Sequence, residues 1–417
     1  MSLQEIDLLE KADPVVRASW QQSQIENLLR HAASRSPFWK ERLAAAGGFA
    51  KLPPQSRAIV RQEFAKGSLV GPKDGVRFFK GKSSGSSGSP VEYYETETNR
   101  AFGLLRTFLQ LVRANVRLES NFTEFRNVTD KLNNGFAIAD SGFAAAALSE
   151  VMDLGAYRRV MVNSQFDEDM LLEALLAKPC GIFSCPPRIS RLVARLVARD
   201  DPRLAKLGIA YYVPRGDRVD TDLRAALSKL GIVTISNYSA TEVGPIADEC
   251  PVETSCYHIA SSNVVLENGA TDADGLRPLL VTHLHSYATP FVRYDIGDAG
   301  ELADSCPHCG HNGPVITRLL GRRGGLLRLA DGTMKPFEIS FAMLRQVVSD
   351  LQDFRVTQSA LGQFIVELDA GRELPSAEIS ALREFFRTHM APGDYVITSG
   401  AINWGNSNKR HLFRSDI

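Results

Sequence analysis

Short apolar segments alternate with amphipathic helical segments along the middle of this chain, and that alternation limits the fold more than any other feature. The strand-like segments are Arg159–Val162, Gly181–Phe183, Ile209–Val213 and Val233–Ile235, and the helical ones start at Glu168, Pro187 and Thr221. Strands that alternate with helices predict βαβ units, whose strands form a largely parallel sheet. We therefore expect an α/β fold.

The rest of the 417-residue chain departs from this pattern, and the length exceeds what one ordinary core accommodates. The first fifty residues and Thr98–Ala114 have helical spacing, whereas short strands dominate from Val264 to Val292. We predict a large N-terminal α/β domain over residues 1–320, a hinge at 321–325 and a small mobile C-terminal α+β domain over 326–417.

The equal numbers of basic and acidic residues, 48 of each, argue against nucleic acid or a membrane surface as the main partner. No apolar run approaches the roughly 18 residues of a membrane span. The first residues lack the basic and apolar regions of a signal peptide. We expect a cytoplasmic protein, for which a homodimer stays open.

The segment Lys82–Pro90 contains five serines and two glycines. Glycine lets successive N–H groups turn toward an anion, and serine hydroxyls add further donors. The alternative is a flexible Gly/Ser linker. Strand-like segments on both sides, Val76–Lys80 and Val91–Glu95, favour the tip of a hairpin that binds phosphate.

Further polar residues follow two predicted strands. Tyr238, Thr241 and Glu242 come after Val233–Ile235, at the sheet edge where ligands gather in α/β folds. They offer an aromatic face, a hydroxyl and an oxygen suited to Mg²⁺, although a surface loop is the alternative. Asp298 ends an Arg-Tyr-x-x-Gly-Asp segment and suits a pair of ribose hydroxyls, whereas a β-turn is the plain interpretation of a Gly-Asp pair.

Two features lie nearer the C-terminus. The segment Gly321–Gly325 has the glycine content of a hinge or an ordinary linker, and its Arg322 suits phosphate or ribose. Lys409 stands alone as a tail charge unless other motifs give it a context.

The order of these motifs resembles the adenylate-forming superfamily of acyl- and aryl-CoA ligases and, within it, the phenylacetate–CoA ligase branch. The series is Ser-Ser-Gly-x-Ser-Gly-x-Pro, Tyr-x-x-Thr-Glu, Arg-Tyr-x-x-Gly-Asp, Gly-Arg, a Gly332…Glu338-Ile339 element and a near-terminal lysine. Ser36–Leu43 and Thr241–Cys250 are similar to that branch in particular. The resemblance covers nearly the whole chain.

The resemblance implies roles for these residues. The Ser83 to Gly88 loop would hold the β- and γ-phosphates of ATP, Thr241 would lie at the α-phosphate and Glu242 would bind Mg²⁺. Lys409 would approach the carboxylate during adenylation, so that Lys409, Glu242 and Thr241 are the implied catalytic residues. The implied nucleotide-binding residues are Ser83, Ser84, Gly85, Ser86, Ser87, Gly88, Gly216 and Asp217 (adenine), Asn237, Tyr238, Ser239, Thr241, Asp298 and Arg322 (ribose).

The chain departs from the family pattern at four points. Ser87 replaces a threonine and keeps its hydroxyl, and Ser239 replaces the glycine after the tyrosine. Arg323 and Gly324 stand where an acidic hinge pair is usual, which puts the usual domain rotation in doubt. Lys409 lacks the preceding glycine.

The implied function is ATP-dependent activation of a carboxylic acid, expected to be aromatic, to an acyl-adenylate, followed by transfer to a thiol. CoA is the default acceptor. One alternative is an acyl-AMP ligase that loads a phosphopantetheine carrier protein or a non-thiol acceptor in secondary metabolism. Another is a non-catalytic nucleotide-binding protein. The residues expected to line the acyl pocket are Phe136, Ala137, Asp140, Ser141, Gly142, Ser236 and Tyr238.

Cys306-Pro307-His308-Cys309 is a knuckle that suits zinc, because two thiolates at this spacing reach one tetrahedral ion. Our preferred ligand set is Cys250, His258, Cys306 and Cys309, with Cys256 as an alternative to His258. A closed shell of four ligands implies a structural Zn²⁺. The alternative is a set of reduced cysteines, which is the interpretation we give to Cys180 and Cys185 in the core.

Overall fold

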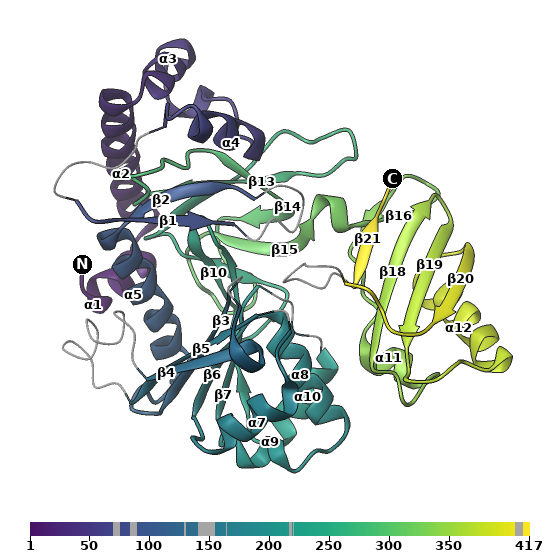
Figure 1. Cartoon of the computed structure of the whole chain (residues 1–417). Helices are drawn as coiled ribbons and strands as arrows, with labels where there is room; N and C mark the ends of the chain where they lie inside the picture. The colour runs from purple at the N-terminus through teal and green to yellow at the C-terminus, as the bar shows by residue number, and fades with distance from the viewer. Residues whose placement is uncertain are drawn as a thin grey trace.

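The computed structural model describes residues 1–69, 76–83, 90–128, 131–140, 155–163, 165–216, 219, 221–404 and 412–417. These residues form a large N-terminal domain and a smaller C-terminal domain, which lies to one side of it (Figure 1). No helix among the described residues is long and apolar enough to cross a membrane.

Helices form the start of the chain, as predicted. They are α1 (Leu3–Lys11), α2 (Pro14–Arg35), α3 (Pro37–Ala46) and α4 (Arg57–Ala65), with a 3₁₀ turn at Phe49–Lys51. Helix α3 begins at a capped end, because the Ser36 hydroxyl accepts from the Trp39 N–H and Pro37 occupies the first turn.

The predicted α/β unit is a six-stranded sheet in the order β4-β5-β3-β6-β7-β8. Its strands are β3 (Phe122–Asn127), β4 (Phe136–Asp140), β5 (Tyr157–Val162), β6 (Ile182–Cys185), β7 (Tyr211–Pro214) and β8 (Val233–Thr234). Every neighbouring pair is parallel except β4 with β5, so the prediction of a largely parallel sheet is confirmed.

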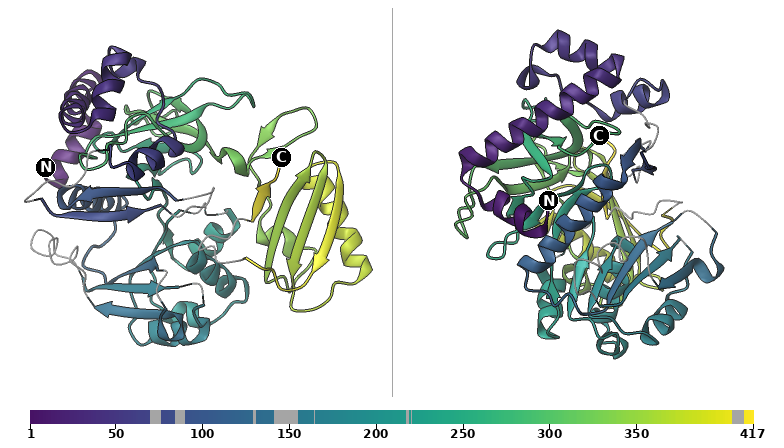
Figure 2. Two further views of the ribbon diagram at one scale, coloured as in Figure 1. Left: turned by 45° about the horizontal axis from the view of Figure 1, so that its top comes forward. Right: turned by 90° about the vertical axis from the view of Figure 1, so that its left-hand side faces the viewer.

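Helices cover both faces of this sheet, as the views in Figure 2 show. One face packs against the helices that the alternating pattern predicted, α7 (Glu168–Leu176), α8 (Pro187–Ala198) and α10 (Thr221–Lys229), and against the short helix α9 (Arg203–Lys206). The other face packs against α5 (Glu97–Arg113) through Phe108, Phe122 and Val213. Cys180 and Cys185 are buried core thiols, as expected.

A seven-stranded antiparallel sheet follows, in the order β12-β13-β14-β15-β11-β10-β9. Its strands are β9 (Asn237–Ala240), β10 (Gly244–Glu249), β11 (Tyr257–Ile259), β12 (Val264–Asn268), β13 (Pro278–His283), β14 (Tyr294–Ala303) and β15 (Val315–Arg322). A separate hairpin, β1 (Phe78–Lys82) with β2 (Glu92–Thr96), flanks the serine-rich segment and confirms the two predicted strands.

The C-terminal domain has a core of its own, built from residues between Leu327 and Phe413. Its four-stranded sheet has the order β20-β19-β18-β21, and α12 packs against it (Figure 1). The elements are η3 (Arg323–Gly325), β16 (Leu327–Arg328), β17 (Met334–Lys335), α11 (Phe341–Arg345), β18 (Asp353–Ala360), β19 (Gln363–Asp369), α12 (Ser376–His389), β20 (Asp394–Ser399) and β21 (Phe413–Ser415).

Candidate active site

Glu242 lies in the turn between β9 and β10, and its carboxylate is buried. Its Oε1 atom accepts from the Tyr294 hydroxyl at 2.9 Å and pairs with the Arg57 guanidinium at 3.0 Å. Burial lowers the pKa of Arg57, but Tyr294 and Glu242 outweigh burial and raise it overall. Burial and the charge of Glu242 raise the pKa of Tyr294. The carboxylate is therefore held between a cation and a neutral phenol.

A second polar group is built on Asp298, which β14 carries after Gly297. The Tyr238 hydroxyl donates to Asp298 Oδ2 at 2.6 Å, and Arg322 Nε lies 3.2 Å from Oδ1. Gly297 has a φ of +87°, which favours glycine, and a Cβ there would lie 3.0 Å from the Arg322 guanidinium. Burial and the charge of Asp298 raise the pKa of Tyr238. Three residues that the sequence singled out separately thus meet here.

The serine-rich hairpin is tied to the same turn. The Tyr93 hydroxyl of β2 donates to the Thr241 carbonyl at 2.8 Å. At the base of the hairpin, the Val91 N–H donates to the Ser83 hydroxyl at 2.8 Å, and the Ser83 N–H donates to the Val91 carbonyl. Ser83 therefore closes the base of the loop. The other predicted phosphate-binding residues, Ser84, Gly85, Ser86, Ser87 and Gly88, lie outside the described residues.

A chain of amide contacts links α5 to the residues before Tyr238. Gln110 Nε2 donates to the Ser236 carbonyl at 2.7 Å, and Asn237 Nδ2 donates to Gln110 Oε1 at 2.9 Å. Asn237 Oδ1 is buried and, among the described residues, has no hydrogen-bond partner. Because buried acceptors are nearly always paired, this oxygen is available to a ligand N–H.

The remaining predicted residues divide between described and undescribed positions. Gly216 follows β7 with a φ of +69°, Ser239 lies in β9, and Phe136 packs against the helix-covered core. Asp217, Ser141, Gly142 and Lys409 lie outside the described residues, as does the side chain of Asp140.

Sequence reasoning missed Arg57, Tyr294, Tyr93 and Gln110. Tyr294 is the tyrosine of the Arg-Tyr-x-x-Gly-Asp motif, so the motif could have identified it as a site residue. The other three carried none, because each reaches the site from an element distant in sequence.

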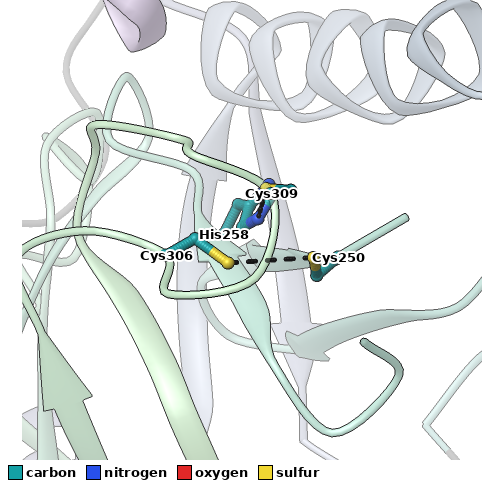
Figure 3. A group of neighbouring side chains, drawn as sticks. All are labelled: Cys250, His258, Cys306 and Cys309. Carbon is teal, nitrogen blue, oxygen red and sulfur yellow. Dashed lines mark hydrogen bonds between the residues drawn. The ribbon is translucent and has the colours of Figure 1, made fainter. Parts of the chain in front are cut away.

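The four preferred zinc ligands come together from the end of β10, from β11 and from the loop after β14 (Figure 3). One ligand atom each from Cys250, His258, Cys306 and Cys309 lies within 4.8 Å of every other. Cys250 and Cys306 have sulfurs 3.8 Å apart, and Cys309 Sγ lies 3.2 Å from His258 Nε2. Burial, with a contribution from His311, lowers the pKa of His258 to about 4, so the imidazole is neutral at pH 7.

The alternative ligand Cys256 also belongs to this neighbourhood. Its sulfur lies 3.7 Å from that of Cys306. Burial and the neighbouring thiols raise its pKa to about 12, and burial likewise raises the pKa of Cys309 to about 11, so thiol pKa values do not separate the two ligand sets. The donor types and their spread otherwise fit a tetrahedral ion with sulfur and nitrogen ligands.

The sequence matches no protein-family model and no curated protein. Solved structures do match. A 2-hydroxyisobutyryl-CoA ligase in the postadenylation state has a TM-score of 0.71 at 14% identity, over 98% of this chain and 92% of that one. In its thioesterification state the TM-score is 0.58 at 15% identity, with the same coverage. The anthranilate-CoA ligase AuaEII, in complex with anthranoyl-AMP, has a TM-score of 0.54 at 13% identity, over 79% and 64% of the two chains. The chain therefore has the fold of these CoA ligases.

Proposed function

We propose that this chain is an AMP-forming acid–CoA ligase. It activates a carboxylic acid with ATP to an acyl-adenylate, releases pyrophosphate and transfers the acyl group to CoA. One observation carries this proposal. Tyr238 and the turn that follows Tyr238 bring two polar groups, one around Asp298 and one around Glu242, to one end of the antiparallel sheet. The phenylacetate–CoA ligase branch is the proposed subtype.

The chemistry explains why such groups are needed. Adenylation brings a carboxylate against the α-phosphate, so two anions must approach each other. Asp298, fixed by Tyr238 and Arg322, would hold the ribose hydroxyls, and the free Asn237 Oδ1 would accept from the adenine amino group. Mg²⁺ on Glu242 would neutralise phosphate charge. Thr241 and Lys409 would orient the reacting groups.

The comparisons support this assignment through the fold that this chain shares with CoA ligases. Both CoA ligases named above were crystallised with an acyl-AMP. The whole chain superposes better on the postadenylation state of the first than on its thioesterification state. That preference suits a C-terminal domain placed as in the postadenylation state of that ligase.

Pyrophosphate release from a panel of aryl and short acyl acids, each with and without CoA, tests the proposal. We expect release with at least one acid, together with a thioester when CoA is present. Glu242→Gln and Asp298→Asn should abolish it, whereas Glu378→Gln, on the distant helix α12, should not. Adenylate formation with no thioester would point to a carrier protein or another acceptor. No release from any acid, with ATP binding intact, would point to a non-catalytic nucleotide-binding protein.

We also propose that Cys250, His258, Cys306 and Cys309 bind one structural Zn²⁺. Support comes from the mutual approach of the four ligand atoms and from the neutral state of His258. The ion would join the end of β10, strand β11 and the loop after β14. It would thereby brace the sheet that carries Tyr238 and Asp298 without taking part in the reaction.

A further inference from the structure

Three arginines surround one buried glutamate on the six-stranded sheet. Glu124 of β3 has a side chain only 3% exposed. Its Oε1 atom lies 2.6 Å from Arg126 Nη2 and 3.6 Å from Arg215 Nη1, and its Oε2 atom lies 3.3 Å from Arg159 Nη2. The Tyr157 hydroxyl donates to the same carboxylate, and Arg215 Nε donates to the Ser184 hydroxyl at 2.7 Å. We call these residues the Glu124 cluster.

The cluster lies on the α5 face of the sheet, toward the carboxyl ends of its parallel strands. Phe122, Ile182 and Val213 pack together on that face. Since side chains alternate along a strand, Glu124, Ser184 and Arg215 share the face, each two residues further along. Ligands of open α/β sheets bind at this edge.

The same edge leads to the proposed active site. Gly216, expected at the adenine, directly follows Arg215. The Ile235 N–H donates to the Tyr212 carbonyl at 2.8 Å, so the chain leading to Tyr238 starts beside the strand that leads to Arg215. Ala139 lies opposite Arg159 in the β4–β5 register, so a residue with a small side chain adjoins the cluster.

Among the residues that the structure describes, the charges of the cluster do not balance. Three guanidiniums face one carboxylate, which leaves two positive charges in excess among the described residues. One arginine would suffice to neutralise Glu124, which leaves the other guanidiniums available to a second anion. The side chains of Arg126, Arg159 and Arg215 are 54%, 33% and 28% exposed, so a ligand can reach them. Guanidinium groups also match the planar geometry of a carboxylate.

We infer that the acid substrate carries a second anionic group, and that the Glu124 cluster binds this group while the first carboxylate is activated near Thr241. The inference rests on the proposed function and narrows it from acids in general to acids with a distal carboxylate or an equivalent anion. Glu124 then acts as a positioning residue, because it holds three flexible arginines in one place.

The test compares matched acids: benzoate with isophthalate and terephthalate, and hexanoate with adipate. We expect at least one diacid to exceed its monoacid partner by about tenfold or more in kcat/KM for pyrophosphate release, the effect of one charge-assisted contact. Arg159→Gln and Arg215→Gln should remove that preference through KM for the diacid, and Arg159→Lys should restore part of it. Arg203→Gln, on the opposite side of the sheet, is the control. Each variant leaves two arginines on Glu124, and thermal unfolding checks its fold.

Calorimetric titration of the same diacids into the protein with AMP separates this inference from the proposed function. Binding of a diacid that Arg215→Gln weakens supports the cluster even if no acid is turned over. Turnover of monoacids with no preference for any diacid overturns the inference and leaves the ligase intact. Variants that raise KM only for CoA or ATP overturn it as well, because the cluster would then bind a phosphate of those molecules.

Discussion

Arg57 Nη2 lies 3.0 Å from Glu242 Oε1, so the proposed metal ligand is already paired with a cation supplied by helix α4. The two side chains are 17% and 3% exposed, which makes this a largely buried ion pair. A divalent ion at Glu242 and the Arg57 guanidinium would compete for the charge of the same carboxylate. Arg57 therefore has one of two roles. It moves toward the phosphates when Mg²⁺ binds, or it neutralises the charge of Glu242 until Mg²⁺ binds.

Replacing Arg57 with Gln should strengthen the response of the protein to Mg²⁺. Without its partner the Glu242 carboxylate is left buried and poorly compensated, at a cost of about 3 kcal/mol in unfolding free energy. Added Mg²⁺ with ATP should recover more stability in this variant than in the wild type. Thermal unfolding with and without Mg²⁺ measures both effects. Arg61→Gln, one turn along α4, is the matched control, and an equal Mg²⁺ response in all three proteins would count against competition.

Removing the Tyr238 hydroxyl should weaken nucleotide binding less than removing the Asp298 charge. Tyr238→Phe leaves Asp298 paired with Arg322, whereas Asp298→Asn weakens both contacts. Tyr238→Phe removes one hydrogen bond that orients the charged carboxylate, whereas Asp298→Asn removes the charge that would bind the ribose hydroxyls directly, and hydrogen bonds to a charged group contribute roughly 1.5–3 kcal/mol. Calorimetric titration with AMP gives the two affinities. The reverse order would show that Asp298 does not contact the nucleotide.

Local patterns were enough to predict the α/β unit and the helices at the start of the chain. Each depends on the spacing of apolar residues or on one cap such as Ser36, and these act within a few residues. The antiparallel sheet from β9 to β15 was predicted only as scattered short strands. Its order brings β15 next to β11, and such pairing is set by contacts distant in sequence.

Prediction of the site was also limited by contacts between residues that are distant in sequence. Tyr238, Asp298 and Arg322 each stood out in a motif, and the structure brings them together. Arg57 reaches Glu242 across 185 positions, and nothing in its local sequence marks that contact. The Glu124 cluster joins arginines from three strand segments, so its charge excess becomes visible only once the sheet has formed.

Removal of zinc should lower the unfolding temperature of the protein. It should not remove any contact to the nucleotide, because the proposed zinc ligands are not nucleotide-binding residues. We expect about one zinc per chain by elemental analysis, as in other four-ligand sites. Cys309→Ser should lose it, whereas Cys256→Ser should keep it if His258 is the fourth ligand. Strong chelators should lower the unfolding temperature of the wild type and of Cys256→Ser, but not that of Cys309→Ser. Loss of zinc in Cys256→Ser with retention in His258→Ala would favour the other ligand set.

The contribution of Glu124 to stability should survive mild acid. Burial raises its pKa, but Arg126 and Arg215 outweigh burial and lower the pKa to about 2, from an ordinary value of 4.5. Because the folded pKa is depressed, the ionised carboxylate contributes stability that is present above pH 4.5 and lost as the pH falls toward 2. The difference corresponds to about 3 kcal/mol. Urea unfolding of the wild type and Glu124→Gln at pH 7, 5, 4 and 3 should show a gap that is constant down to about pH 5 and then narrows. A gap that closes by pH 5 would contradict the depressed pKa.

The link between the domains should depend on Arg323, which stands where the family that the sequence resembles usually has an acidic pair. Arg323 Nη2 lies 2.6 Å from Asp295 Oδ2, and its Nη1 lies 3.5 Å from Asp272, while Arg328 pairs with Asp274 at 2.6 Å. These contacts fix the start of the C-terminal domain against the large domain. If the C-terminal domain rotates between half-reactions, Arg323→Ala should loosen the present orientation. The distribution of distances between the domains should then broaden, as measured by fluorescence transfer between labels on α2 and α12.

The control is Arg318→Ala, because Arg318 is an exposed residue of β15, the strand that leads to Arg323. High salt should mimic Arg323→Ala in the wild type, since these partly exposed pairs are screened. An unchanged distance distribution in Arg323→Ala would mean that packing, not this ion pair, sets the orientation.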